Sequence, residues 1–395
     1  MGASSTVIFI IFFLLSVSEV IISDLTDLKI PLDLILFNDL SNKNVKKIYK
    51  QAIEFNVKKI VINDTNKYQK YSRKFQKKKI KVYFSIDDVF KKNKYKSFLT
   101  INAISGIDGL EPSLKIIKYS NNFAIANKES IICGWSFISK KLKKYKTNFI
   151  PLDSEHFSIW SLLKNEKKDN INKIYLTASG GPFLNKKLSS IKNVMPKIAL
   201  NHPNWKMGKK ISIDSATMMN KIFEIIEAIK IFNLNAKTFS ILIHPKSYIH
   251  AIINFKNGLT KLLAHETTME IPIANAMHLA EDKYTFSRSD FSFSKLNGLN
   301  FIEPNIKQFP LLEILNYNFN NTYFEIILVS INDELVKKYL DNKISYISIH
   351  KNMINFLKKP YFTKYYSIKP KNIDDIKYMV NKVNLYLNEN LKYNE

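Results

Sequence analysis

The sequence predicts an α/β protein with three parts: a doubly wound amino-terminal domain, a second α/β domain with an open sheet, and a carboxy-terminal helical bundle. Two observations predict this class. Strand-like and helix-like segments alternate as far as about residue 150, and only helix-like segments follow residue 310. Such alternation is typical of a parallel sheet covered by helices. The 395 residues are long enough for more than one domain. We place the domains at 1–150, 151–285 and 311–395, with a linker at 286–310.

In the first domain the predicted strands are short runs rich in Ile, Val and Phe, bounded by polar residues. They lie at 32–37, 57–64, 78–85, 97–110 and 121–130, the fourth ending in a glycine-containing turn and the last including a loop. Apolar residues at helical spacing predict helices at 42–55 and 113–120.

The second domain is predicted from strand candidates at 173–179 and 239–245, which flank a long helix that begins near Ser215. Asp214 and Ser215 are good N-cap residues for that helix. The dipeptide Asn257-Gly258 predicts a hairpin between adjacent strands. After the linker, four helix-like runs predict the bundle: 311–319, 323–340, 346–358 and 372–391.

Composition narrows the function classes. A formal charge of +26 is a signal for nucleic acid or an anionic membrane. Lysine supplies almost all of it, however, and Arg73 and Arg288 are the only arginines. Abundant Lys, Asn, Ile and Phe with few Gly indicate an AT-rich genome, so we interpret the charge as a solvated lysine surface. Cys133 is the only cysteine, which excludes an internal disulfide and a multi-cysteine zinc site.

The amino terminus carries an apolar segment at 6–23. Its uninterrupted part, 7–15, is shorter than the roughly 20 residues that span a bilayer. Glu19 interrupts the rest, and no basic region precedes the segment, so a signal peptide is a weak match. A buried helix or strand, an anchor, and a gene model with a wrong start are all open.

Three acidic residues predict a divalent-cation site. Asp153 and Glu155 alternate along a predicted strand end, where side chains two apart share a face. With Glu224 they make an all-oxygen set, which suits Mg²⁺ or Mn²⁺ rather than zinc. Ordinary surface charge is the competing interpretation of the two acids alone, and only the combination with nearby polar motifs favours a metal.

The neighbouring motifs suit a phosphorylated ligand. Ser179 precedes two glycines, which let backbone N–H groups approach an anion, although an ordinary tight turn explains them equally well. Asn220 shares a helix face with Glu224, and Lys221 is either a phosphate contact or one of many surface lysines. His202 and Trp205 belong to a mobile lid or to a packed loop. For His244 and His250 a core or supporting role is favoured.

Taken together, these motifs resemble one family. LDSEH, LTASGGPF, HPNWKMGKKISIDSATMMNK and LIHPKSYIHAIINFKNG resemble 1-deoxy-D-xylulose 5-phosphate reductoisomerase in order and spacing, chiefly over 32–285. The resemblance implies a Rossmann-like NADPH-binding domain, Mg²⁺ or Mn²⁺, a homodimer, and no nucleic-acid or membrane partner. It implies formation of 2-C-methyl-D-erythritol 4-phosphate in the non-mevalonate isoprenoid pathway. A cytoplasmic bacterial enzyme is expected, with a plastid as the alternative location.

The resemblance also implies roles for residues. Asp153, Glu155 and Glu224 would hold the cation, while Glu155, Lys128 and His202 would serve catalysis. His202, Trp205 and Met207 would form a lid. The implied substrate contacts are Ser154, Ser179, His202, Ser215, Asn220, Lys221 and Glu224, and the implied NADPH contacts are Gly2, Ala3, Ser4, Lys43, Asn44, Ala103, Asn127, Glu129 and Gly208.

The chain departs from the family pattern in three places. The first strand and glycine loop are expected to be degraded, because only residues 2–5 resemble the loop and no strand precedes them. Lys246 and Glu270 stand where Gln and Arg are usual. SINDE at 330–334 keeps only part of an Ala-Asn-Glu motif.

Two alternatives therefore stay open. One is a degenerate, cofactor-deficient paralogue that binds phosphorylated ligand and metal without turnover, which NADPH binding would distinguish. The other is a basic nucleic-acid-binding protein on an enzyme fold, which steep salt dependence of DNA binding would support.

Overall fold

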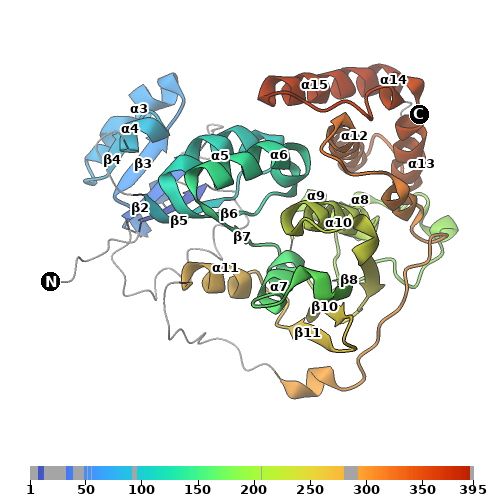
Figure 1. Cartoon of the computed structure of the whole chain (residues 1–395). Helices are drawn as coiled ribbons and strands as arrows, with labels where there is room; N and C mark the ends of the chain where they lie inside the picture. The colour runs from blue at the N-terminus through green and yellow to red at the C-terminus, as the bar shows by residue number, and fades with distance from the viewer. Residues whose placement is uncertain are drawn as a thin grey trace. The chain divides into compact units, whose positions relative to one another are not determined.

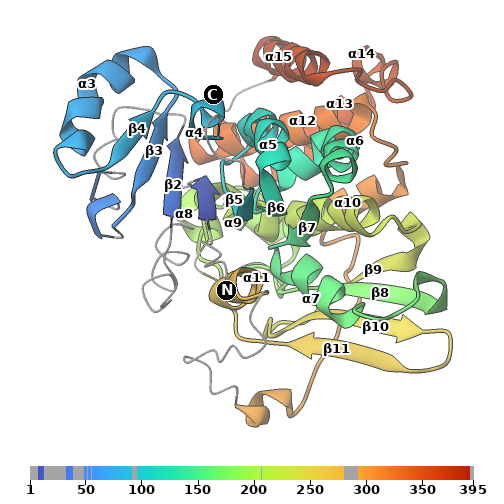
Figure 2. The same cartoon turned by 60° about the vertical axis from the view of Figure 1, so that its left-hand side comes forward.

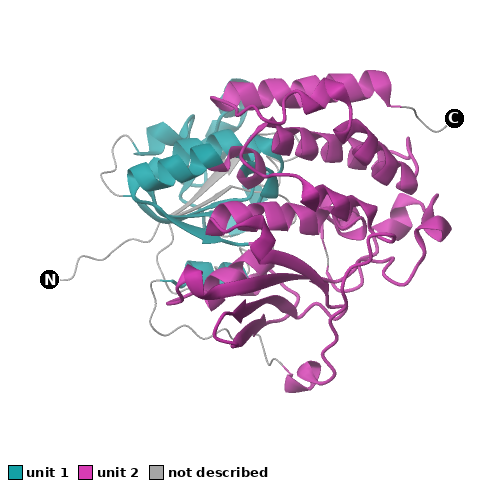
Figure 3. Ribbon diagram, turned by 45° about the vertical axis from the view of Figure 1, so that its right-hand side comes forward, with its two compact units in different colours: residues 1–130, 136–152, 272–285 teal, residues 131–135, 153–271, 286–395 magenta. Residues whose placement is uncertain are grey.

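Figure 1 shows the computed structural model of the chain. The structure describes residues 8–12, 33–38, 49–50, 52–54, 56–90, 96–205, 207–279 and 292–391. The chain forms two compact units (Figure 3). Unit 1 comprises 1–130, 136–152 and 272–285, and unit 2 comprises 131–135, 153–271 and 286–395. The division into three domains and a linker stays a prediction.

Unit 1 is built on a seven-stranded sheet in which every neighbouring pair of strands is parallel. The strands are β1 (Ile8–Phe12), β2 (Asp33–Asn38), β3 (Lys59–Ile62), β4 (Lys81–Tyr83), β5 (Ser97–Asn102), β6 (Ser120–Ile125) and β7 (Asn148–Pro151). Their order is β4-β3-β2-β1-β5-β6-β7 (Figure 2). The chain thus winds outward in both directions from β1, which confirms the doubly wound class.

Described helices join consecutive strands of this sheet from β3 to β7. They are α3 (Thr65–Gln76), α4 (Ile86–Phe90), α5 (Leu110–Ile116) and α6 (Lys128–Tyr145), with short 3₁₀ turns η1 (Ile107–Gly109) and η2 (Ile117–Tyr119). The sequence did not predict α3 or α6. Few apolar residues mark α3, and residues 127–134 are all buried, so the first half of α6 lacks an amphipathic pattern.

β1 corrects the expectation that the first strand is lost. Residues of the amino-terminal apolar segment form the central strand, with Ile10 opposite both Ile35 and Thr100 in the flanking strands. A central parallel strand is covered on both faces, so it reads as an unbroken apolar run and resembles a membrane segment. The proposed loop residues Gly2, Ala3 and Ser4 lie outside the described residues.

Unit 2 contains a four-stranded sheet in the order β11-β10-β8-β9. The strands are β8 (Ile171–Ala178), β9 (Phe239–Ile243), β10 (Ile249–Phe255) and β11 (Thr260–Ala264). β8 and β9 are parallel, and β10 runs antiparallel to β8 and β11. Gly258 has a φ of +86° in the turn between β10 and β11, which confirms the predicted hairpin.

Helices cover one face of this sheet (Figure 1). Apolar residues of α7 (Ser154–Leu162) and α10 (Met219–Phe232) share a buried cluster with β8, β9 and β10. On another part of the sheet, Tyr248, Ile249 and Ile252 are covered by Leu299 and Phe301 of the predicted linker. These two residues of the predicted linker therefore pack on the core of unit 2.

The long helix predicted to begin near Ser215 is in fact two helices, α9 (Lys209–Ala216) and α10. Met218 lies between them with a φ of +66°, in the left-handed region, so the chain changes direction there. Asp214 and Ser215 consequently lie in the last turn of α9, and the N-cap prediction for them is wrong. Asn220 and Lys221 fall in the first turn of α10.

The helical character of the carboxy-terminal part is confirmed. Its elements are η7 (Pro310–Asn316), α12 (Tyr323–Leu340), α13 (Tyr346–Leu357), α14 (Pro360–Thr363) and α15 (Ile373–Asn390). α12 packs against α9, α13 and α15. A buried ion pair between Lys230 of α10 and Glu325 of α12, 3.0 Å long, ties these helices to the sheet-bearing part.

The remaining short elements complete the description. They are α8 (Pro196–Ala199), α11 (Glu270–Met277), η3 (Lys168–Asn170), η4 (Leu188–Ile191), η5 (Ala236–Thr238) and η6 (Phe293–Leu296). No described helix is both long and apolar enough to cross a membrane.

Candidate active site

Asp153 and Glu155 stand at the start of a helix, and not along a strand as predicted. Asp153 is the N-cap of α7, and its Oδ1 accepts a hydrogen bond from the Glu155 N–H at 3.3 Å. Strand β7 ends at Pro151, just before this cap. The strand argument for a shared face is therefore wrong. The cap and the first helical turn nevertheless bring the two carboxylates together.

The predicted trio of acids does converge. One carboxylate oxygen each from Asp153, Glu155 and Glu224 lies within 4.8 Å of the others. Glu224 comes from α10 and is buried. Three carboxylates at this spacing can share one divalent cation, and their hard oxygen atoms suit Mg²⁺ or Mn²⁺.

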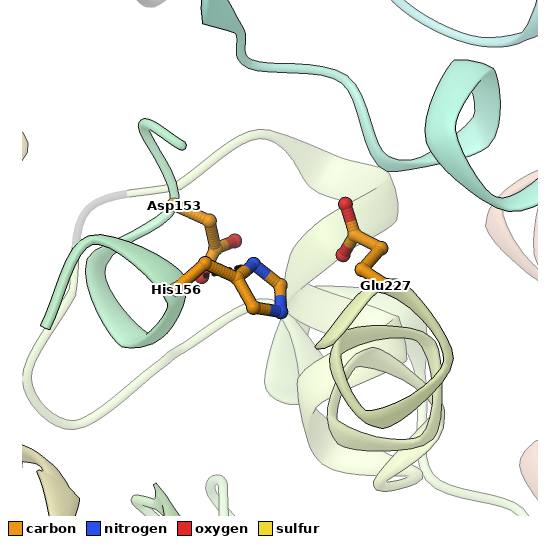
Figure 4. Close-up of side chains that lie close together, drawn as sticks. All are labelled: Asp153, His156 and Glu227. Carbon is orange, nitrogen blue, oxygen red and sulfur yellow. Dashed lines mark ion pairs between the residues drawn. The ribbon is translucent and has the colours of Figure 1, made fainter. Parts of the chain in front are cut away.

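A second group overlaps the first, because Asp153, His156 and Glu227 also bring ligand atoms within 4.8 Å of one another (Figure 4). His156 Nε2 donates to the Glu224 carbonyl at 2.8 Å, since a carbonyl only accepts. That leaves His156 Nδ1, 3.8 Å from Asp153 Oδ1, as the nitrogen on the acidic side. Sequence reasoning gave His156 and Glu227 no role. Glu227 follows Glu224 by three residues, a helical spacing that could have revealed it.

Lys221 bridges two of the carboxylates. Its Nζ donates to Glu155 Oε1 at 2.5 Å and to Glu224 Oε2. The other Glu155 oxygen accepts from Ser154 Oγ, and the other Glu224 oxygen accepts from Asn220 Nδ2 at 2.6 Å. Three predicted site residues, Ser154, Asn220 and Lys221, therefore meet around Glu155 and Glu224 within unit 2.

These contacts set the charge states. Burial alone would raise the pKa of Glu155, but the Lys221 ammonium and nearby hydrogen bonds outweigh it, so the pKa lies well below its usual value. Burial alone would lower the pKa of Lys221, but the charges of Glu155 and Glu224 raise that pKa instead. Glu155 is therefore ionised and Lys221 is protonated at neutral pH.

Ser179 and His202 form a second cluster of predicted residues. The Ser179 Oγ and His202 Nε2 are 2.9 Å apart. His202 Nδ1 accepts from the N–H groups of Asn204 and Trp205, so the proton of the neutral ring is on Nε2. Ser179 Oγ accepts from this nitrogen and from the Gly181 N–H at 3.0 Å. Its own hydroxyl proton is thereby left for a ligand. Burial lowers the pKa of His202 to about 4, so the ring is neutral at pH 7.

The glycine turn after Ser179 packs directly on the end of α9. A Cβ added at Gly181 would lie 3.0 Å from Ala216 Cα and 3.1 Å from the Ser215 carbonyl oxygen. Gly181 also has a φ of +67°. Only glycine meets both conditions without strain, so this turn sets the backbone position of Ser215 relative to Ser179.

The predicted lid segment rests on neighbouring parts of unit 2. Asn204 Nδ2 donates to the Pro245 carbonyl at 2.6 Å and to Ser247 Oγ at 2.8 Å. The Trp205 ring meets the His250 ring edge-on with centroids 6.0 Å apart, and His250 stacks on His265 at 3.7 Å. His250 therefore supports the segment, as the favoured interpretation expected. Gly208 is the N-cap residue of α9.

The predicted NADPH residues that the structure describes in unit 1 lie at the carboxyl ends of strands. Ala103 follows β5, Asn127 follows β6, and Glu129 lies in the first turn of α6, next to the predicted catalytic residue Lys128. Asn127 Nδ2 donates to the Gly106 carbonyl at 3.0 Å, while its buried Oδ1 has no partner among the described residues. Lys43 and Asn44 lie outside the described residues, as does the amino-terminal loop.

Comparison with known families gives three matches. Residues 34–134 match a family described as 1-deoxy-D-xylulose 5-phosphate reductoisomerase. Residues 149–232 match the 1-deoxy-D-xylulose 5-phosphate reductoisomerase C-terminal domain, and 265–384 match the DXP reductoisomerase C-terminal domain.

Whole-chain relatives carry the same name. The chain is 52% identical over 349 residues to the 1-deoxy-D-xylulose 5-phosphate reductoisomerase of Pelagibacter ubique, covering 87% of this chain and 89% of that one. The enzyme of Clostridium tetani is 34% identical, with coverage of 91% and 92%.

Solved structures of DOX-P reductoisomerase are similar throughout. A complex with NADPH, fosmidomycin and magnesium has a TM-score of 0.84 and 27% identity, covering 97% of this chain and 98% of that one. The Zymomonas mobilis enzyme with NADPH has a TM-score of 0.84 and 25% identity, with coverage of 98% and 99%.

Proposed function

Because the chain belongs to the 1-deoxy-D-xylulose 5-phosphate reductoisomerase family, we propose that unit 2 carries its substrate and cation site and unit 1 its NADPH site. The reaction rearranges the carbon skeleton of 1-deoxy-D-xylulose 5-phosphate and reduces the resulting aldehyde to 2-C-methyl-D-erythritol 4-phosphate. NADPH supplies the hydride for the reduction. The observation that supports this proposal most is the convergence of Asp153, Glu155 and Glu224 next to Asn220 and Lys221.

The donor set fits a magnesium or manganese ion. Asp153, Glu155 and Glu224 offer only oxygen atoms, and their ligand atoms are close enough together to share one cation. When bound, the cation supplies Lewis-acid polarisation of the carbonyl and hydroxyl oxygens of the substrate. Glu155 is held ionised by Lys221 and keeps Ser154 in contact through its second oxygen.

Several side chains are available to bind the substrate. The Ser179 hydroxyl has a proton to donate, because its oxygen already accepts from His202 and Gly181. Asn220 Oδ1 is buried with no partner among the described residues, which suits it to accept from a substrate hydroxyl. With Ser215 and Lys221, these groups would hold the phosphate and its neighbouring hydroxyls.

The remaining assignments follow the family pattern. Lys128, at the start of α6 in unit 1, keeps the catalytic role that the family pattern implies. His202, which is neutral at pH 7, would donate a hydrogen bond rather than carry charge. Trp205 and Met207 would exclude water as part of the lid.

For NADPH the fit rests on Asn127. Its buried Oδ1, without a partner in the described part of the chain, is an acceptor placed just after the carboxyl end of β6. A doubly wound sheet binds its ligand at the carboxyl ends of its strands, and a carboxamide N–H of nicotinamide would satisfy this oxygen. Ala103 and Glu129 complete the proposed contacts within the described part of unit 1, and the contact proposed for Gly208 of unit 2 follows the family pattern alone.

Turnover by the purified chain tests the proposal. NADPH oxidation is followed with 1-deoxy-D-xylulose 5-phosphate and Mn²⁺, beside an equilibrium titration of NADPH. Turnover that depends on both substrate and cation supports the assignment. NADPH binding without turnover would contradict the catalytic roles in unit 2, and absence of NADPH binding would contradict the cofactor site.

We also propose that the chain acts as a homodimer in the bacterial cytoplasm, as the family pattern implies. Light scattering of the purified protein would give a mass near twice 46.0 kDa. A monomeric mass at micromolar concentration would contradict the dimer.

A further inference from the structure

The Lys221 ammonium occupies carboxylate oxygens that a divalent cation would need. Its Nζ lies 2.5 Å from Glu155 Oε1 and also donates to Glu224 Oε2. Both acids belong to the trio that fits the cation. The Lys221 side chain is 5% exposed, so this contact is an interior feature and not a chance surface pair.

Each carboxylate oxygen of Glu155 and Glu224 accepts a hydrogen bond from the protein. Glu155 Oε2 accepts from Ser154 and Glu224 Oε1 accepts from Asn220, so every oxygen of both carboxylates already has a protein donor. Each of these oxygens keeps a second lone pair, so a cation held by both acids can leave neutral donors in place but would lie beside the Lys221 ammonium. Lys221 is the donor that a second positive charge repels, whereas Ser154 and Asn220 are neutral.

We propose that Lys221 is an exchangeable counter-cation that holds the carboxylates until the divalent cation binds and then transfers to the substrate phosphate. The proposal rests on the proposed function, because that function supplies both the cation and the phosphate. Before the exchange, three carboxylates and one ammonium leave a charge of about −2 at the site. Afterwards the cation neutralises most of the acids, and the ammonium becomes free to pair with the phosphate as a point charge.

Lys221 is placed to make this transfer. It lies in the first turn of α10, beside Asn220 and just beyond the left-handed Met218. Helix N-termini favour anions. Its four-carbon stem has rotatable bonds, so the ammonium can move by several ångströms while the helix stays in place.

The exchange makes binding of cation and phosphate mutually favourable. A cation that releases Lys221 raises the affinity for a phosphate group, and reciprocity requires that a phosphate group raise the affinity for the cation. The competing possibility is a permanent structural ion pair. In that case the two ligands would bind independently of Lys221.

Calorimetric titration of Mn²⁺ into the full chain, without NADPH or sugar substrate, tests the proposal. Propylphosphonate serves as the anion because it has no hydroxyl or carbonyl oxygen with which to chelate the cation. We expect it to raise the Mn²⁺ affinity of the wild type about tenfold. Lys221→Gln should bind Mn²⁺ about tenfold more tightly than the wild type without the anion, and should gain nothing when it is added.

Lys237→Gln is the matched control, because it removes the same charge from an exposed position of unit 2. It should behave as the wild type. Unchanged Mn²⁺ affinity in Lys221→Gln, or an undiminished gain from propylphosphonate, would overturn the proposal. If Lys221→Gln fails to fold, the titrations of the wild type alone test the proposal. Absence of any gain in Mn²⁺ affinity from propylphosphonate then overturns the exchange.

Failure of this proposal is distinguishable from failure of the proposed function. Wild-type turnover of 1-deoxy-D-xylulose 5-phosphate without the Mn²⁺–phosphonate coupling would refute only the exchange. Coupling without turnover would leave the exchange standing and refute the catalytic assignment.

Discussion

Replacement of Gly181 by alanine should lower the free energy of unfolding of unit 2 and weaken its binding of the substrate phosphate. Gly181 has a φ of +67°, and left-handed backbone costs an L-residue roughly 1–2 kcal/mol. The new Cβ would also meet Ala216 Cα at 3.0 Å and the Ser215 carbonyl oxygen at 3.1 Å. Both are backbone atoms of a packed helix, so the overpacking adds roughly 1–3 kcal/mol. The expected loss is therefore about 2–5 kcal/mol in the free energy of unfolding.

Gly258→Ala is a matched control in the same unit. Gly258 has a φ of +86°, but nothing lies within 4 Å of an added Cβ. This variant should lose only the backbone contribution, roughly 1–2 kcal/mol. Urea unfolding of both variants, followed by circular dichroism, measures the difference.

Kinetics separates a local shift from general instability. Displacement of α9 by the new methyl group moves Ser215 relative to Ser179, so KM for 1-deoxy-D-xylulose 5-phosphate should rise in Gly181→Ala. It should stay near the wild-type value in Gly258→Ala. Equal losses of stability in the two variants, together with equal KM values, would refute the claim that the glycine turn positions the phosphate site.

Three further outcomes are expected. Glu224→Gln should abolish Mn²⁺-dependent turnover while circular dichroism shows an intact fold, because the neutral amide keeps the shape but loses the charge; full activity with Mg²⁺ would disprove the site. Lys230→Met leaves the buried Glu325 carboxylate without its ion-pair partner and should cost about 3–5 kcal/mol in urea unfolding, whereas Lys230→Met with Glu325→Gln should cost less; equal losses would contradict the buried pair. Burial lowers the pKa of His350 to about 4 from an unfolded value near 6.5, so its stabilising effect is complete above about pH 6.5 and is lost as the pH falls toward 4. His350→Leu should remove a pH dependence of about 1.4 kcal/mol per pH unit from the free energy of unfolding in that window. Urea unfolding curves whose pH dependence is unchanged would contradict this prediction.

Local patterns were sufficient for much of the fold. The alternation of strands and helices predicted the doubly wound sheet, and Asn257-Gly258 predicted the β10–β11 hairpin. These features depend on the period of apolar residues and on turn chemistry, which are properties of neighbouring residues.

Local patterns gave wrong predictions where the same residues suit two different kinds of local structure. The run that forms β1 reads as a membrane-like segment, because its strand partners β2 and β5 are distant in sequence. Asp214 and Ser215 are good N-cap residues in isolation, but the break at Met218 places them at the end of α9. Asp153 likewise suits a strand end in isolation, but in the structure it is the N-cap of α7.

The chemical types at the site were determined by the sequence alone: three acids, an adjacent Asn-Lys pair, and a serine before two glycines. Only the tertiary structure decided which atoms meet. From the sequence, Lys221 is equally well explained as a surface charge. In the structure its ammonium donates to Glu155, which is 66 positions away along the chain. His156 and Glu227 likewise come together with Asp153 only in the folded chain. Residue type limits what chemistry a side chain can perform, whereas long-range packing decides its partners, because the contacts that bring them together are separated by many residues in the chain.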